Sequence, residues 1–287
     1  MKKYIIKLKI LCIIISKLLI VSSLSCQNVE QTIELADAQH KLGNYAIAIK
    51  EYQRALFFSK GNYNNILCRK LGDCYFEQKE YSKASKQYEF SYFNEDNDSI
   101  KNELVFKKTT CCLLSGNYYY ALIELLSLPD TLPCYFNNRK EFYLGVTYFG
   151  LENFDQSKIH FLNCLDSSDT GSAEAIAGLF RRKNLYTPNP KTALWFSLII
   201  PGSGQLYSGD IKNGINSLLL CAGLFTLGVD VVIEYSVPDA ITGVLPWYQR
   251  YYMGGYQNAR DIARQKREKK RNDTYRQILS VIGSSLQ

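Results

Sequence analysis

The chain repeats a pattern of large and small side chains four times in succession. The register is set by Ala36, Gly72, Thr109 and Gly145, which lie 36, 37 and 36 residues apart. At fixed offsets the same kinds of residue recur: Tyr45, Tyr81, Tyr118 and Phe154; Ala48, Ala84, Ala121 and Ser157; Tyr52, Tyr88, Leu125 and Phe161; Ala55, Ser91, Leu128 and Cys164. Stacked helix pairs need this alternation, because small residues lie where helices cross and large residues fill the gaps between them. The pattern predicts an all-α helical solenoid of four repeats over residues 29–165.

The repeats are clearest in LGNYAIAIKEYQRAL (42–56), LGDCYFEQKEYSKASKQYEFS (71–91), SGNYYYALIELL (115–126) and LGVTYFGLENFDQSKIHFLNC (144–164). In these segments the chain resembles the tetratricopeptide repeat (TPR) family. Two departures fall in the third repeat, where Thr109 replaces the usual Gly or Ala and Leu128 replaces a small residue. The resemblance implies a non-enzymatic scaffold that binds a protein or peptide. An irregular helical bundle is the alternative.

The resemblance also implies where a partner binds. In the family, the first helix of each pair lines the concave face of the stack. The residues at the matching positions here are Arg69, Asp73, Phe76, Phe106, Thr110, Arg139, Phe142 and Phe149. A face of this composition suits an extended or helical peptide held by apolar anchors and polar contacts. The alternative is that the chain itself covers Phe106, Phe142 and Phe149.

A further amphipathic segment follows the repeats. In residues 171–184, Ala173, Ile176, Leu179 and Phe180 lie on one helical face, which predicts a capping helix for the solenoid. The break TPNP (187–190) then ends the helical pattern.

Residues 191–260 carry three apolar segments, 193–207, 214–235 and 240–256. Only the second is long enough to cross a bilayer of about 30 Å as one helix. A motif that begins in the first segment and extends past its end is made of Pro201, Gly202, Gly204, Gln205, Tyr207 and Gly209. This motif resembles a bacterial membrane module with the signature Pro-Gly-x-Gly-Gln-x-Tyr-x-Gly, which implies a helical transmembrane hairpin in contact with the lipid bilayer.

The N-terminus predicts an export signal or an anchor. Residues 1–25 begin with lysines, continue with an apolar stretch and end in small residues. Cys26 lies where a signal would be cleaved or a lipoprotein would be modified, and an uncleaved anchor is the alternative; Lys7, Lys9 and Lys17 interrupt the apolar stretch that each of these requires.

The positive charge of the chain gathers near its C-terminus. Residues 260–276 hold eight Lys or Arg and three acidic residues, within a net charge of +7 for the whole chain. We expect residues 261–287 to form a basic tail that faces solvent or anionic lipid. We do not expect a nucleic-acid partner, because no base-reading motif accompanies the basic residues. A basic segment favours the cytoplasmic side, which conflicts with export of the repeats.

Motifs for catalysis or metal binding are not found in the sequence. It has two histidines, His40 and His160, and lacks an HExxH or Gly-x-Ser-x-Gly motif. We therefore expect no enzyme activity and no cofactor or metal. The expected function is that of an adaptor at the bacterial cell envelope, with the repeats exported and the chain associated with the membrane. A small transport or membrane-biogenesis component, acting through the hairpin and through Asp230 and Glu234, is the alternative.

Overall fold

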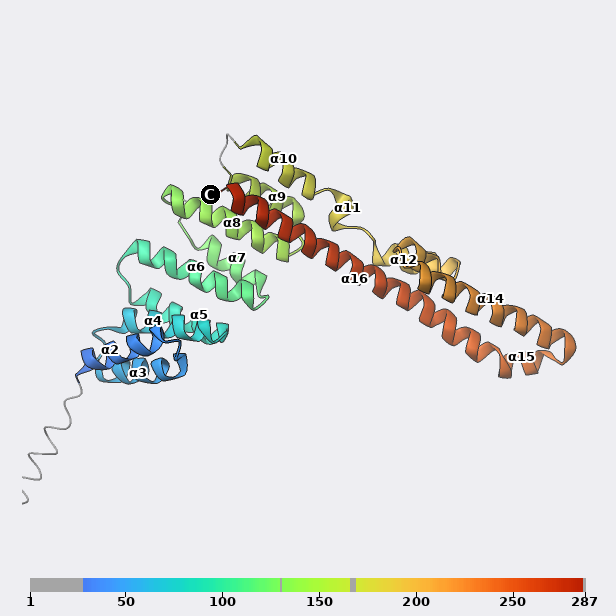
Figure 1. Cartoon of the computed structure of the whole chain (residues 1–287), viewed down its shortest axis with the longest axis horizontal. Helices are drawn as coiled ribbons and strands as arrows, with labels where there is room; N and C mark the ends of the chain where they lie inside the picture. The colour runs from blue at the N-terminus through green and yellow to red at the C-terminus, as the bar shows by residue number, and fades with distance from the viewer. Residues whose placement is uncertain (1–27, 130, 166–168, 286–287) are drawn as a thin grey trace, which may run out of the picture. The chain divides into compact units, whose positions relative to one another are not determined.

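The computed structural model describes residues 28–129, 131–165 and 169–285, in which the chain forms fifteen helices and no strand (Figure 1). The prediction of an all-α protein is confirmed. The predicted signal or anchor, residues 1–25, lies outside the described residues. The helices belong to two units, Met1–His160 and Phe161–Gln287.

The first unit is a succession of antiparallel helix pairs (Figure 1). Its helices are α2 (Val29–Lys41), α3 (Tyr45–Phe58), α4 (Asn64–Glu77), α5 (Tyr81–Phe93), α6 (Asp98–Leu114), α7 (Tyr118–Leu126), α8 (Cys134–Gly150) and α9 (Phe154–Asn163), the last of which ends beyond the unit boundary. Each helix from α2 to α7 packs on the next one. On α9, Ser157 donates a hydrogen bond of 2.8 Å to the carbonyl oxygen of Gly145 on α8.

The alternation of large and small residues builds the core of this unit. All the repeated positions are buried except Tyr45, Tyr81 and Tyr118, which are half-buried. The packing is close, because a Cβ added to Gly72 would lie 2.5 Å from the ring of Tyr88. Both unusual residues of the third repeat are also buried: Thr109 donates to the carbonyl oxygen of Val105, and Leu128 joins an apolar cluster.

The four turns inside the pairs share one geometry. The residue two places after each first helix has a positive φ: Gly43 (77°), Lys79 (61°), Gly116 (72°) and Glu152 (59°). In each turn the next backbone N–H donates back to a carbonyl oxygen in the last turn of the helix, as from Asn44 to Gln39 and from Glu80 to Tyr75. This is the Schellman arrangement that ends helices with a left-handed residue. The four helix pairs therefore have the same turn geometry as well as the same pattern of core residues.

The second unit is built along one long helix. Its helices are α10 (Thr170–Leu179), α11 (Arg182–Leu185), α12 (Pro190–Ile199), α13 (Ser203–Tyr207), α14 (Ile211–Glu234), α15 (Val237–Gly243) and α16 (Leu245–Ser285). Helix α16 packs against each of the other six. Helices α14 and α16 lie side by side and are joined through α15 (Figure 1).

The helices divide the chain differently from two of the predicted boundaries. The single capping helix expected over 171–184 is two helices, α10 and α11, and both pack on α16. The expected basic tail is the continuation of α16, in which Ala259, Ala263, Ile278 and Ile282 are fully buried. Buried residues recur at spacings of three and four along this helix, and that periodicity offers a helical face for packing despite the surrounding charges.

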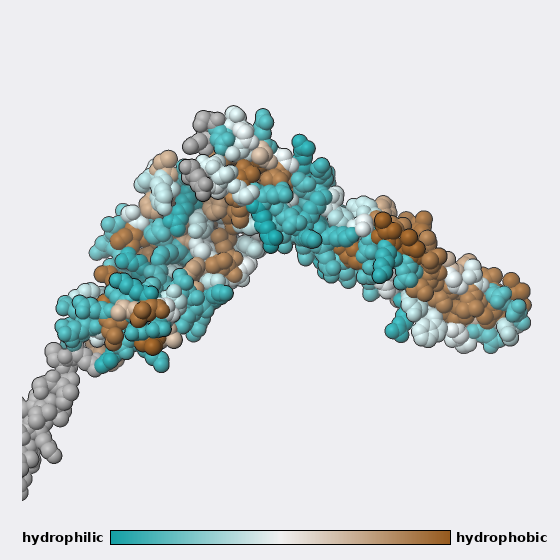
Figure 2. All heavy atoms as spheres, in the orientation of Figure 1, coloured by the Kyte–Doolittle hydropathy of each residue, from teal (hydrophilic) through white to brown (hydrophobic). Residues whose placement is uncertain are grey.

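Among the described helices, α14 alone is long and apolar enough to cross a membrane. Most of its residues are exposed in the isolated chain. Figure 2 shows apolar residues, in brown, over much of α12, α14 and α15. The predicted apolar segment 214–235 thus corresponds to α14, whereas the segment 240–256 is divided between α15 and the start of α16.

Candidate functional site

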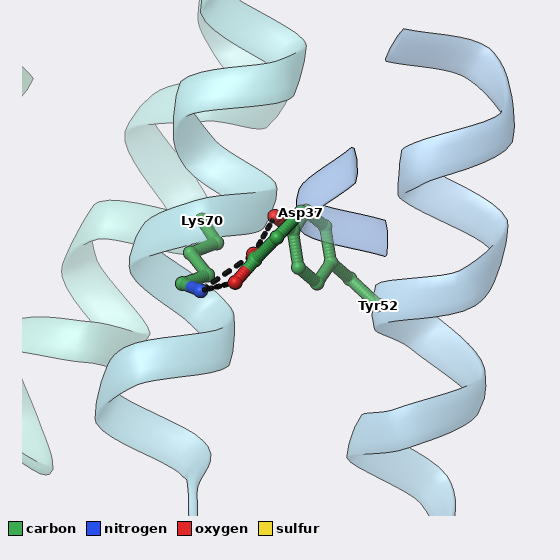
Figure 3. A network of polar contacts seen from close by, with 3 residues as sticks. All are labelled: Asp37, Tyr52 and Lys70. Carbon is green, nitrogen blue, oxygen red and sulfur yellow. Dashed lines mark hydrogen bonds and ion pairs between the residues drawn. The ribbon is translucent and has the colours of Figure 1, made fainter. Parts of the chain in front are cut away.

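A network of three polar side chains joins the first two helix pairs (Figure 3). Tyr52 on α3 donates a hydrogen bond of 2.5 Å to Oδ1 of Asp37 on α2. Lys70 on α4 lies 2.5 Å from Oδ1 and 2.6 Å from Oδ2 of the same carboxylate. Its Nζ also lies 5.7 Å from the centre of the Tyr52 ring. One carboxylate therefore links both helices of its own pair to the first helix of the next pair.

The same network recurs one repeat later. Tyr88 on α5 donates to Asp73 on α4 at 2.8 Å, and Nζ of Lys107 on α6 lies 2.5 Å from Oδ1 of Asp73. Between α6 and α8 the chemistry changes. There Arg139 pairs with Glu103 at 2.6 Å, and the hydroxyl groups of Thr110 and Tyr143 are 3.0 Å apart. Polar contacts therefore connect the first helices of all four pairs.

These contacts change the proton affinities of their members. Partial burial raises the pKa of Asp37, but the hydrogen bonds from Lys70 and Tyr52 outweigh this effect, so the pKa lies below its usual value. Burial, followed by the hydrogen bond to Asp37, raises the pKa of Tyr52 well above its usual value. Burial and the charge of Asp73 do the same for Tyr88. The carboxylate of Asp37 is thus held ionised and both tyrosines are held protonated near neutral pH.

A pocket of about 340 Å³ opens beside the second network. Its lining comes from α2, α4, α5 and α6 and comprises His40, Asp73, Phe76, Glu77, Tyr88, Lys107 and Thr110. Three predicted binding residues, Asp73, Phe76 and Thr110, therefore meet in one place. Because Lys107 is paired with Asp73, the exposed carboxylate of Glu77 leaves the pocket with a negative charge. Phe76 provides an apolar wall and packs edge-on against Tyr81 at 5.6 Å.

The aromatic residues predicted for the far end of the face are engaged within the stack. The expectation that Phe106 lines an open surface is wrong, because its side chain is fully buried. It stacks on Phe136 at 6.0 Å, and the guanidinium of Arg139 lies 4.5 Å from its ring centre. The reason is that α8 packs directly on α6 and covers this position.

The other predicted residues of this face are partly covered. Phe142 is half-buried against Tyr143, and Phe149 is half-buried against Phe154. Arg69 is half-buried on α4 and does not line the pocket.

Sequence reasoning did not single out Glu77 or Lys107. Lys70 and Lys107 are 37 residues apart and follow Asp37 and Asp73, which are 36 apart, so the repeat register contains the signal for the ion pairs. It also did not single out an apolar surface on α7. There Tyr119, Tyr120, Ile123 and Leu126 are exposed.

The motif of the second unit, residues 201–209, lets the backbones of neighbouring helices approach closely at the start of α14. Pro201 follows Ile200, whose extended backbone (φ −128°, ψ 112°) ends α12, as is typical of a residue before proline. Gly202 has φ +89°, and a Cβ there would lie 2.1 Å from the carbonyl oxygen of Gly214. At Gly204 a Cβ would lie 1.9 Å from the carbonyl oxygen of Ala193. Both glycines are required by close approach of the backbone.

Gln205 lies at the centre of the hydrogen bonds of this motif. Its side chain is fully buried, accepts a hydrogen bond of 2.8 Å from Ser197 on α12 and donates one of 2.8 Å to the carbonyl oxygen of Gly255 on α16. The hydroxyl of Tyr207 accepts from the backbone N–H of Asn189 at 3.2 Å, and Gly209 (φ +74°) forms the turn into α14. The motif thus joins α12, α13, α14 and α16.

No group of three or more His, Cys, Asp or Glu side chains suited to a metal occurs among the residues that the structure describes. No protein-family model matches the chain, and no curated protein has a significantly similar sequence. The resemblances to the TPR family and to the membrane module therefore rest on the residues and geometry given above.

Proposed function

We propose that this protein is a non-enzymatic adaptor that holds a protein or peptide at the bacterial cell-envelope membrane. The observation that carries the proposal is the pocket formed by α2, α4, α5 and α6. The repeated core, the shared turns and the linear packing of α2 to α7 support a TPR-like solenoid, and such solenoids present extended surfaces for other polypeptides.

The pocket indicates the kind of segment that would bind. Phe76 offers an apolar surface and Glu77 an exposed carboxylate, while the Asp73–Lys107 pair is already satisfied. A peptide that places an apolar side chain on Phe76 and a basic group near Glu77 fits this chemistry. The predicted apolar anchor Phe106 has no part in this arrangement because it belongs to the core.

The second unit is proposed to provide the membrane contact through α14 and the exposed apolar residues near it. The same region bears on the alternative function in transport or membrane biogenesis. That alternative assigns a role to Asp230 and Glu234, but both lie exposed toward the C-terminal end of α14, where an interfacial position accounts for them. The geometry therefore favours the adaptor.

Site-specific photo-crosslinking tests the proposal. A photoreactive amino acid replaces Glu77 in the pocket or, as a control, Tyr120 on the exposed face of α7, and the full chain is irradiated in its own membranes. We expect a discrete protein adduct from position 77, and we expect Phe76→Ala to remove it. An adduct that forms equally from position 120, or only from there, would contradict a partner site in the pocket.

A further inference from the structure

A polar pocket lies beside the helix that is apolar enough to cross a membrane. It has a volume of about 250 Å³ and is formed by α13, α14 and α16. Its polar lining residues are Gln205, Asn213, Asn216, Ser217, Arg250 and Asn258. The lining includes no acidic residue, so its one full charge is the guanidinium of Arg250.

Several hydrogen-bonding groups in this pocket have no partner within the part of the chain that the structure describes. Arg250, Asn216 and Asn258 are exposed, and among the described residues Arg250 has no ion pair and the two asparagine side chains have no hydrogen bond, whereas Asn213 is bonded to Asp210. The hydroxyl of Ser217 is buried and also lacks a hydrogen bond among the described residues. The exposed groups of Arg250, Asn216 and Asn258 are free to meet a ligand, whereas the buried hydroxyl of Ser217 carries a cost that a bound ligand would remove. These hydrogen-bond donors, together with the single positive charge, favour an anionic ligand.

The surroundings of the pocket indicate an amphiphile. Leu220 and Tyr251 line the pocket together with the polar residues, and both are exposed. Ile215, Leu219 and Met253 are exposed on the same two helices. A small soluble anion would leave these apolar residues uncovered, whereas the acyl chains of a lipid would lie along them.

The position of the pocket along α14 agrees with a headgroup. Asn213, Asn216 and Ser217 lie in the first two turns of the helix, within about 10 Å of its start at a rise of 1.5 Å per residue. If α14 crosses the bilayer, these turns lie at the level where phosphate groups meet the hydrocarbon region.

We infer that the pocket formed by α13, α14 and α16 binds the phosphate-containing headgroup of an anionic phospholipid, with Arg250 facing the phosphate. Asn216, Ser217 and Asn258 supply the neutral hydrogen bonds. The inference rests on the proposed membrane association of the second unit, but it adds a specific lipid site to that association.

Lipid retention by the purified full chain tests this site. The protein is purified in detergent that contains equal amounts of phosphatidylglycerol and phosphatidylcholine, and each retained lipid is measured by mass spectrometry. We expect phosphatidylglycerol to be retained preferentially. Arg250→Gln should weaken its retention about tenfold, the effect of losing one hydrogen bond to a charged group. Arg264→Gln removes the same charge from an exposed position of α16 outside the pocket and should leave retention unchanged.

Asn258→Leu provides a second test because it leaves the charge in place and fills the polar pocket. It should also lower retention of phosphatidylglycerol, and the thermal midpoint of each variant in detergent shows whether it is folded. Equal retention of the two lipids, or equal effects of Arg250→Gln and Arg264→Gln, would overturn the inference. Binding of glycerol 3-phosphate as tight as that of phosphatidylglycerol would show that the acyl chains add nothing and would assign the pocket to a free phosphate compound instead. Membrane association itself is measured separately by tryptophan quenching, so its failure is distinguishable from failure of this site.

Discussion

At the scale of single residues, Asp37 is the group whose role is clearest. It accepts hydrogen bonds from Tyr52 and Lys70 and so joins three helices from two repeats. A carboxylate that accepts charge-assisted hydrogen bonds is stabilised in its ionised form. The lowered pKa of Asp37 follows from these contacts, and it ties the stability of the stack to pH.

Replacing this carboxylate should change how the free energy of unfolding depends on pH under acid conditions. An unfolded aspartate has a pKa of about 3.9. Since the folded pKa of Asp37 is lower, its contribution is complete above about pH 5 and is lost as the pH falls through the folded pKa. At pH 7, Asp37→Asn should destabilise the chain by about 0.5–1 kcal/mol, a modest value because the pair is partly exposed.

Denaturant unfolding of the full chain in detergent, followed by circular dichroism between pH 2 and pH 7, measures this difference. Asp273→Asn, at an exposed position of α16, is the control and should have little effect. A difference between Asp37→Asn and the unmodified chain that stays constant down to pH 2 would show that the carboxylate does not supply the stabilisation.

At the scale of elements, the turns inside the helix pairs have one backbone shape but different residues. Glycine occupies the left-handed position at Gly43 and Gly116, whereas Lys79 and Glu152 occupy it in the other two pairs. A residue with a Cβ is strained there, and glycine is not. No atom lies within 4 Å of a Cβ added at either glycine. A substitution there therefore reports backbone strain without steric collision.

Substitutions at Gly43 and Lys79 should have different effects on the free energy of unfolding. Gly43→Ala should destabilise the chain by about 1 kcal/mol through backbone strain alone, because no atom lies within 4 Å of the added Cβ. Lys79→Gly should be neutral or stabilise it by up to about 1 kcal/mol, because relief of strain opposes the greater chain entropy of glycine in the unfolded state. Denaturant midpoints of the two variants test the pair, and stabilisation by Gly43→Ala would refute the shared turn.

The glycine motif of the second unit makes a further prediction. Gly204→Ala should lower the thermal midpoint in detergent and cost about 1–3 kcal/mol, because its Cβ would overlap the backbone of Ala193. Gly223→Ala is the matched control, since nothing lies within 4 Å of a Cβ added at that position of α14. If both substitutions lowered the thermal midpoint equally, close approach of the backbone at Gly204 would not be what the motif provides.

Much of the element structure could be predicted from the sequence, because the repeat fixes which positions face the core. Ala48, Ala84 and Ala121 recur in register, and all are fully buried. Contacts between distant segments could not be predicted in this way. Arg271 donates a hydrogen bond to the carbonyl oxygen of Leu185, 86 residues earlier, and no local pattern relates them. Phe106 was misplaced because its burial depends on the packing of α8, which the family pattern does not specify.

At the scale of the whole molecule, the proposal assigns partner binding to the first unit and membrane association to the second. The two tryptophans of the chain, Trp195 on α12 and Trp247 on α16, both belong to the second unit and are exposed. Their fluorescence therefore reports on that unit alone and is independent of the N-terminal segment.

Quenching by brominated lipid tests the membrane contact. When the full chain is reconstituted into phosphatidylcholine vesicles, tryptophan emission should fall if the acyl chains carry bromine, because exposed apolar residues of the second unit would then touch them. Trp195→Phe and Trp247→Phe variants show which tryptophan is quenched. Equal emission in brominated and plain vesicles would contradict membrane association.

If the pocket beside Phe76 binds a protein segment, the affinity for that segment depends on the charge of the pocket. The segment that crosslinks from position 77 is synthesised as a peptide and titrated against the full chain in detergent. Glu77→Lys reverses an exposed charge of the pocket, and we predict that it weakens binding about fivefold to tenfold, as expected for a contact worth about 1 kcal/mol. Glu174→Lys, an equal reversal at an exposed position of α10, should leave the affinity unchanged. An affinity that is the same for the unmodified chain and for Glu77→Lys would contradict the account.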